Sequence, residues 1–334
     1  MKRSSVLFAG AGMLLLILDS RCAAQSAANA LDLCLNTVIP SLFPMFVLSG
    51  VLVSGCSGAS GRLLTGLEHW IGLPKGNGTL FLMGILGGFP VGAQSIAQAV
   101  ENRNLSKSDG ERMLGFCNNC SPAFLFGITA RVFSDPAAPL WIFLIQLESA
   151  LVVAAFTSFE GTCHSSSARS PLSLTDAVIR GMRSMASVCA WVILAGVAVG
   201  FLERWIYPIL PGILPQIITG STEITGGILG LSGIPDEGLR FMLCSGCVCF
   251  GGFCVWMQIR SLASVQGLST GHCFRQKAVQ AVLGLILAEG IRVCGPVTLA
   301  TVPVLLVIRK ITLENPDRSM YNSSRKGGHY HVVP

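Results

Sequence analysis

Two uncharged stretches of the chain are interrupted by polar and helix-disrupting residues of types that can bind a solute. The first is Gly87-Gly88-Phe89-Pro90-Val91-Gly92-Ala93-Gln94, and the second is Cys117-Asn118-Asn119-Cys120-Ser121-Pro122. Backbone groups that are freed from helical pairing inside a bilayer persist only where protein or a water-lined cavity satisfies them. The two breaks therefore predict a solute site near the middle of a membrane.

The first break has the composition of a re-entrant turn. Gly88 and Gly92 permit backbone conformations that are closed to other residues, and Pro90 disfavours helix at the residue before it. Gln94 and Ser95 then fall on the first turn of the returning helix, whose free N–H donors and partial positive charge suit an anionic group. The alternative is that the glycines serve close helix packing and that the proline only bends the helix.

The second break places two adjacent amides, Asn118 and Asn119, in the middle of an otherwise apolar run, followed by Ser121 and Pro122. Burial of amides in hydrocarbon is unfavourable without partners, and Pro122 disrupts the helical hydrogen bonds around them. Amides of this kind also form structural hydrogen bonds between helices. The amide pair together with the Ser-Pro step favours a binding role.

A third polar feature, Glu223 with Thr225, opens a glycine-rich stretch in the second half of the chain. A carboxylate at that position can serve as a proton or cation site, and the Thr225 hydroxyl can add a ligand. The alternative places Glu223 in the headgroup region as an ordinary loop acid.

The composition indicates an integral membrane protein. Of the 334 residues, 51% are hydrophobic and 12% are charged, whereas a soluble domain carries about 25% charged residues. Uncharged runs occupy residues 33–61, 79–100, 113–130, 184–202, 205–222 and 241–259. We predict an all-α polytopic protein of about eight spans. Residues 1–309 form a single transmembrane domain, with residues 6–18 as an uncleaved first helix, and residues 310–334 form a cytoplasmic tail.

The basic residues predict the topology. The net charge of +6 is dispersed among short loops rather than gathered on one face, which argues against nucleic acid as a partner. If residues 79–100 enter and leave the bilayer on one side, the loops around Lys107, Arg180 and Lys277 and the tail are all cytoplasmic. This arrangement requires a second re-entrant hairpin near residues 222–235.

Weak internal similarity supports the second hairpin. Gly84-Ile85-Leu86-Gly87 recurs as Gly227-Ile228-Leu229-Gly230, and Cys117-Asn118-Asn119-Cys120 has a counterpart in Cys244-Ser245-Gly246-Cys247. The order is the same in both halves, whereas the predicted membrane orientation is opposite. We therefore predict two inverted repeats, at about residues 30–159 and 176–262, as in many secondary transporters.

The sequence gives little support for a metal site or for catalysis. The chain has 13 cysteines, most of them in apolar runs, and we interpret them as packing residues rather than as ligands of a metal. No Walker loop, nucleophile elbow or catalytic triad is found, so we expect neither an enzyme nor a cofactor. Glu289 and Arg292 are expected to mark a turn between two short spans, or else to form a pair within one long helix.

A family resemblance appears at these residues. Pro40-Ser41-Leu42-Phe43-Pro44-Met45-Phe46, Gly88-Phe89-Pro90-Val91-Gly92-Ala93, Phe116-Cys117-Asn118-Asn119-Cys120-Ser121-Pro122 and Glu223-Ile224-Thr225 resemble the sporulation integral membrane protein YlbJ (SpoVV) family, within the nucleoside-recognition or Gate-domain group. The resemblance implies a polytopic protein related in architecture to concentrative nucleoside transporters. It also implies movement of dipicolinic acid across the outer forespore membrane during sporulation.

These observations together predict secondary or facilitated transport of a small polar or anionic solute that binds at the midplane of the bilayer. The expected partners are that solute and the lipid bilayer, and formation of a homo-oligomer is left open. The alternative function is a non-transporting membrane scaffold that is needed for spore assembly.

Overall fold

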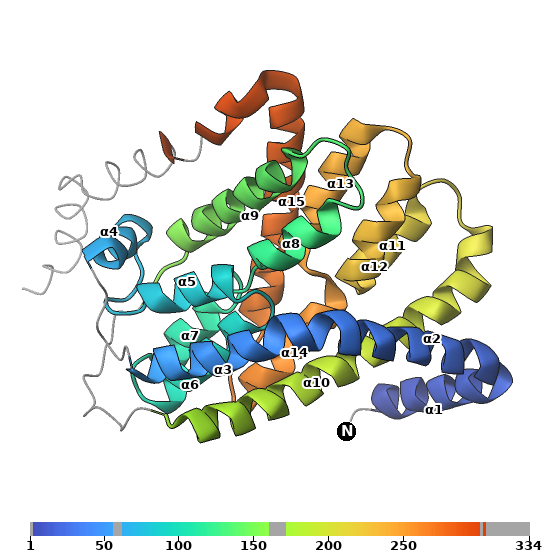
Figure 1. The fold of residues 1–334 in the computed structure, drawn as a ribbon, viewed down its shortest axis with the longest axis horizontal. Helices are drawn as coiled ribbons and strands as arrows, with labels where there is room; N and C mark the ends of the chain where they lie inside the picture. Colours follow the sequence, from blue (N-terminus) through green and yellow to red (C-terminus); the bar gives the residue numbers. More distant parts are fainter. Residues whose placement is uncertain (1–2, 56–61, 160–171, 301–302, 305–334) are drawn as a thin grey trace, which may run out of the picture.

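A computed structural model describes residues 3–55, 62–159, 172–300 and 303–304. These residues form helices α1 to α15, joined by short π and 3-10 turns, and contain no strand (Figure 1). The predicted all-α class is therefore confirmed. The predicted tail, residues 310–334, lies outside the described residues.

Five helical stretches are long and apolar enough to cross a membrane. They are Ser20–Gly55, Ala138–Ala155, Leu174–Ile209, Glu237–Ser264 and Gly271–Ala300. The first joins α2 (Ser20–Leu33) to α3 (Ile39–Gly55) through a π turn (Cys34–Val38), and the second is α9 (Ala138–Ala155). The third contains α10 (Leu174–Phe201), and the last contains α15 (Gly271–Cys294). The prediction of a helical membrane protein is confirmed, and shorter helices account for the remaining apolar runs.

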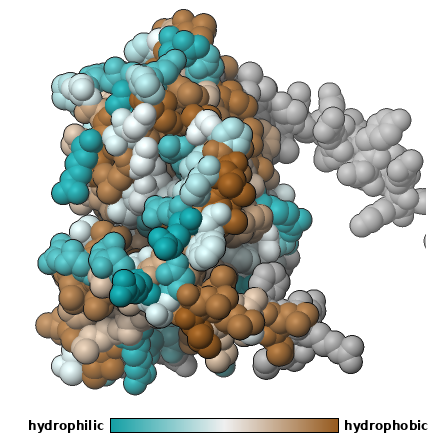
Figure 2. Space-filling model, turned by 90° about the vertical axis from the view of Figure 1, so that its right-hand side faces the viewer, coloured by the Kyte–Doolittle hydropathy of each residue, from teal (hydrophilic) through white to brown (hydrophobic). Residues whose placement is uncertain are grey.

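Helix α15 shows how the sequence suits a bilayer. Its buried face carries Cys273, Lys277, Gln280 and Gly284. Its exposed face carries Val279, Val282 and Ile286. Small and polar residues inside with aliphatic residues outside are typical of a helix that packs within a bundle and faces lipid. Figure 2 shows apolar side chains, in brown, over large parts of one face of the molecule, interspersed with hydrophilic ones in teal.

Two pairs of short helices lie on opposite sides of the molecular centre (Figure 1). The first hairpin consists of α5 (Gly78–Leu86) and α6 (Val91–Glu101), and its turn contains Gly88 with φ of +79°. The second hairpin consists of α11 (Leu214–Thr222) and α12 (Ile224–Gly230), which meet at Glu223. The second hairpin begins earlier than predicted, because residues 205–209 prolong α10 as π and 3-10 turns instead of starting a new span.

Two longer helices are broken near the centre. Helices α7 (Lys107–Met113) and α8 (Pro122–Thr129) are separated by the non-helical residues 114–121, which we call the first break. Pro122 begins α8, where the missing N–H is not needed. Helices α13 (Glu237–Phe250) and α14 (Gly252–Ser264) meet at Gly251 and Gly252, the second break, where φ is +83° and +85°. Glycine tolerates these left-handed conformations.

Several basic segments meet at one end of the molecule. Arg180 on α10 forms a salt bridge with Glu101 at the end of α6, at 2.8 Å. The backbone N–H of Ser269 donates to Glu111 on α7, also at 2.8 Å. These contacts agree with the predicted common side for the loops near Lys107 and Arg180. Lys277 departs from the prediction because it is buried within α15 rather than lying in a loop.

The remaining helices lie at the periphery. Helix α1 (Arg3–Leu18) precedes α2, and α4 (Arg62–Ile71) precedes the first hairpin. Glu289 and Arg292 form a salt bridge within the last turns of α15. The expectation of a turn between two short spans at this pair is therefore wrong, and the pair within one long helix is correct.

Candidate functional site

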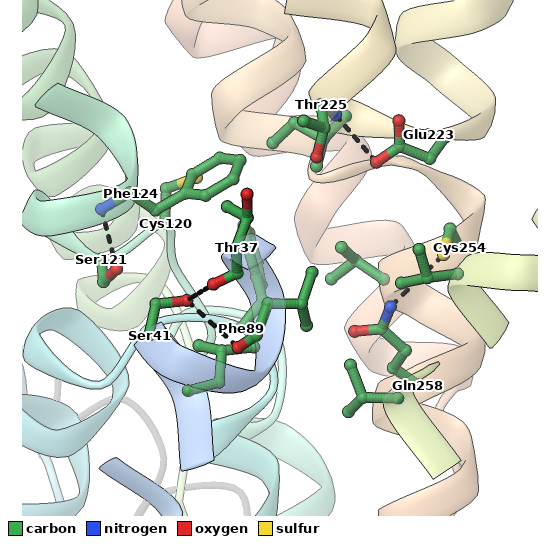
Figure 3. A pocket seen from close by; sticks show the side chains of 16 residues that line it. Thr37, Ser41, Phe89, Cys120, Ser121, Phe124, Glu223, Thr225, Cys254 and Gln258 are labelled. Atoms are coloured by element: carbon green, nitrogen blue, oxygen red, sulfur yellow. Dashed lines mark hydrogen bonds between the residues drawn. The ribbon is translucent and has the colours of Figure 1, made fainter. Parts of the chain in front are cut away.

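A cavity lies between the turns of the two hairpins (Figure 3). Phe89 contributes from the first hairpin, Ser121 from the end of the first break, and Glu223 with Thr225 from the second hairpin. Its empty volume, including the open mouth, is about 570 Å³. A water-sized sphere can occupy about 70 Å³ of it, so the cavity in this state is smaller than the about 300–1,000 Å³ that is typical of sites for small molecules. The structure thus brings Ser121, Glu223 and Thr225, three of the predicted site residues, to one cavity.

Polar groups face the cavity from two sides (Figure 3). Thr37 lies in the π turn between α2 and α3, and Ser41 lies in the first turn of α3. The Ser41 hydroxyl donates to the carbonyl oxygen of Thr37 at 2.7 Å. Gln258 on α14 lines the opposite side. The sequence did not predict these three side chains as site residues. Ser41 lies in one of the motifs of the family resemblance, whereas nothing in the sequence predicted the π turn.

Glu223 has a defined structural role at the cavity. Its carboxylate accepts hydrogen bonds from the N–H groups of Thr225, at 2.8 Å, and Gly226, at 2.6 Å. The side chain therefore caps the N-terminus of α12, where a negative charge is stabilised by free donors and by the helix dipole. Among the described residues that line the cavity, Glu223 carries the one ionisable carboxylate.

Asn118 caps the N-terminus of α6 in the first hairpin, as Glu223 caps α12 in the second. Its Oδ1 accepts from the N–H of Ala93 at 2.8 Å, and its Nδ2 donates to the carbonyl oxygen of Leu114 at 2.6 Å. The sequence predicted that a solute anion binds at the N-terminus of α6. In the structure, the Asn118 amide occupies that place, and its side chain is fully buried.

The predicted glycines bring the first hairpin against the first break. A Cβ atom on Gly92 would overlap the carbonyl oxygen of Cys117, and one on Gly88 would lie 2.8 Å from the Cβ atom of Ser121. Pro90 immediately precedes α6 and completes the turn. This close packing holds Phe89 at the cavity wall.

Gln94 and Ser95 lie away from this cavity. The Nε2 of Gln94 donates to the carbonyl oxygen of Phe46 at 3.4 Å, whereas Gln94 Oε1 and Ser95 Oγ are buried without a hydrogen-bond partner. Gln94 borders a second cavity that is also lined by Arg180 and Arg183. These two predicted residues are thus not brought together with Glu223.

Asn119 connects the first break to Lys277, for which the sequence predicted a position in a loop. Its Nδ2 donates to the carbonyl oxygen of Phe116 at 2.7 Å, and its Oδ1 accepts from Lys277 Nζ at 3.3 Å. Lys277 is only 3% exposed. A signal for this residue was present in the four- and three-residue spacing of Cys273, Lys277 and Gln280, which places all three on one helical face.

Gln146 on α9 holds the backbone of the first break. Its Oε1 accepts from the N–H of Cys120 at 2.9 Å, and its Nε2 donates to the carbonyl oxygen of Cys120 at 3.0 Å. Both groups would otherwise be unpaired in the protein interior, where an unpaired backbone group is unfavourable. The clamp thus fixes the segment that carries Ser121 to the cavity.

The long apolar helices and the buried polar breaks define a helical integral membrane protein. The chain is 31% identical over 116 residues to the sporulation integral membrane protein YlbJ of Bacillus subtilis (strain 168). This similarity confirms the resemblance to the YlbJ family that the motifs predicted. The matched segment covers 34% of this chain and only 28% of the length of the Bacillus protein. No model of a known protein family and no solved structure matches the chain.

Proposed function

We propose that the protein is a secondary or facilitated transporter of a small polar or anionic solute. By resemblance, the solute is dipicolinic acid and the membrane is the outer forespore membrane during sporulation. The observation that carries the proposal is the cavity in which the turns of both hairpins meet the first break and α14. Broken helices and hairpins around a central site are characteristic of secondary transporters.

The order of elements supports the two inverted repeats. In the first half, α3 is followed by the hairpin α5–α6, the broken helix α7–α8 and the long helix α9. In the second half, α10 is followed by the hairpin α11–α12, the broken helix α13–α14 and the long helix α15. Each half would contribute one hairpin turn to the solute site, as in transporters that are built from two related halves.

The cavity also suggests how charge is balanced during transport. An anionic solute would approach the Glu223 carboxylate, and two negative charges in a site of low dielectric repel each other strongly. A proton or a metal cation bound at Glu223 would remove this repulsion, so we assign Glu223 the role of coupling site. The hydroxyls of Ser121 and Thr225 and the amide of Gln258 would then orient the solute.

The proposal is tested with purified protein reconstituted into liposomes and labelled dipicolinate. We expect uptake above that of protein-free liposomes and a loss of about threefold or more in Thr225→Val, which removes a cavity hydroxyl. Thr222→Val is the matched control, because Thr222 lies outside the cavity and its hydroxyl donates to the carbonyl oxygen of Ile218.

Absence of dipicolinate uptake by the wild-type protein would overturn the proposal. The scaffold alternative is tested in sporulating cells that express Thr225→Val or Ser121→Ala at normal levels. A scaffold would support normal loading of dipicolinate into spores in both variants, whereas a transporter would not.

A further inference from the structure

Lys277 is a buried lysine whose hydrogen-bond partners are neutral. Its Nζ lies 2.8 Å from Gln280 Oε1 and 3.3 Å from Asn119 Oδ1, and it is 5.0 Å from the centre of the Phe89 ring. No Asp or Glu of the described residues forms an ion pair with it. A buried charge that lacks a counter-charge is strongly unfavourable, and ionisable groups within a membrane usually mark a solute or ion pathway.

The first break is built to receive this ammonium group. The Asn119 amide nitrogen is held by the carbonyl oxygen of Phe116, at 2.7 Å, so its Oδ1 faces Lys277. The Gln280 amide nitrogen is held by the carbonyl oxygen of Gly115, at 3.4 Å, so its Oε1 faces Lys277 as well. Both oxygens are thus oriented by the non-helical backbone that leads to Ser121.

Phe89 separates the lysine from the solute cavity. Phe89 lines the cavity, whereas Lys277 does not, and the ammonium lies over the Phe89 ring. The described residues that line the cavity include no Lys or Arg. Rotation of the Phe89 side chain would therefore open Lys277 to the cavity.

We propose that protonated Lys277 is the counter-charge for a carboxylate of the transported anion, and that the Phe89 side chain covers it until the solute binds. This inference rests on the proposed transport function and adds the residue that would recognise a carboxylate of the solute. The binding energy comes in part from relief of the uncompensated charge, so a solute without negative charge gains much less.

The test uses reconstituted protein and three probes of similar shape: dipicolinate with two carboxylates, picolinate with one, and pyridine-2,6-dicarboxamide with none. We expect Lys277→Met to raise the KM for dipicolinate by about tenfold or more, with a change of about twofold or less for the dicarboxamide. Lys277→Arg keeps the charge and should keep the preference for the dianion. Lys107→Met, at the exposed start of α7, is the matched control and should change neither KM.

A second variant protects the test against failure of Lys277→Met to fold. Asn119→Asp places a carboxylate beside the ammonium and supplies an internal counter-charge. It should therefore reduce the preference for dipicolinate as Lys277→Met does, while the lysine remains in place. If either variant is folded and keeps the wild-type preference for the dianion, the assignment of Lys277 is overturned. If the wild-type protein moves none of the probes, the proposed function fails instead.

Discussion

The two hairpins differ in how they are attached to the rest of the molecule. The first hairpin is bonded to the break beside it: Asn118 accepts from the N–H of Ala93, and the N–H of Asn119 donates to the carbonyl oxygen of Gly84 at 3.2 Å. Gly84 and Gly92 both press against the carbonyl group of Cys117. Hydrogen bonds and backbone contact thus tie this hairpin firmly in place.

The second hairpin packs against its neighbours with few hydrogen bonds to them, and one of these joins the Tyr207 and Thr219 hydroxyls. Glu223 caps α12, and Gly220 and Gly227 bring α11 and α12 into backbone contact. Within the described part of the chain, no hydrogen bond joins α11–α12 to α13–α14. A Cβ atom on Gly252 would lie 3.3 Å from the carbonyl oxygen of Thr222, so the contact with the second break is by van der Waals packing.

This difference in hydrogen bonding indicates which part of the site can move. Elements with few tertiary hydrogen bonds open at lower free energy than elements that are tied into a network. We therefore infer that the first hairpin and the first break form a fixed platform, and that the second hairpin, with Glu223 at its turn, is the moving element. The following predictions are ordered from the largest expected effect to the smallest.

Gly92→Ala should have the largest effect on folding. The new Cβ atom would overlap the carbonyl oxygen of Cys117, and the hydrogen-bonded platform leaves no room for it to shift. We expect little or no folded protein, measured as the yield of monodisperse protein in detergent. Gly226→Ala is the comparison in the second hairpin, because its nearest neighbour, Glu223 Oε2, would lie 3.2 Å away. Equal yields of the two variants would contradict the difference between the hairpins.

Asn118→Leu should destabilise the protein by about 2–4 kcal/mol, because it leaves two buried groups, the N–H of Ala93 and the carbonyl oxygen of Leu114, without their partner. Thermal unfolding in detergent measures the effect. Asn29→Leu, an exposed amide on α2 that pairs with Gln25, is the control and should change the stability by less than about 0.5 kcal/mol. A small effect at Asn118 would show that the platform is not held by this amide.

Glu223→Gln should separate stability from transport. One amide oxygen can still accept a hydrogen bond at the start of α12, so we expect a loss of about 1 kcal/mol or less in stability. Uptake of dipicolinate should nevertheless fall by about tenfold or more, because the coupling charge is gone. Unchanged uptake by this variant would remove Glu223 from the mechanism.

The double change of Cys117→Ala and Cys120→Ala should have the smallest effect. Both thiols belong to the buried apolar core, and Cys120 also borders the cavity. The clamp by Gln146 uses only the backbone of Cys120. We expect folding and most of the uptake to persist. Stoichiometric zinc in the wild-type protein that is lost in this variant would contradict the interpretation of the cysteines as packing residues.

The sequence by itself determined the features that depend on local chemistry. Hydropathy predicted a helical membrane protein, because backbone groups in lipid must be paired within each segment. The turn at Gly88 and Pro90 and the start of α8 at Pro122 follow from the conformational limits of glycine and proline. Glu223 and Thr225 were also found locally, because a carboxylate two residues before a hydroxyl at the start of a helix is visible in the sequence.

Only the tertiary structure decided which distant groups meet. Lys277 lies 158 residues from Asn119 along the chain, and Gln146 lies 26 residues from Cys120, and neither contact has a local signal. In the packed bundle, α15 lies beside the first break, and the buried face of α15 points toward it. The spacing of Cys273, Lys277 and Gln280 places them on one helical face, but it does not show whether that face meets water or the interior. Burial, which the fold alone assigns, placed Lys277 beside the first break.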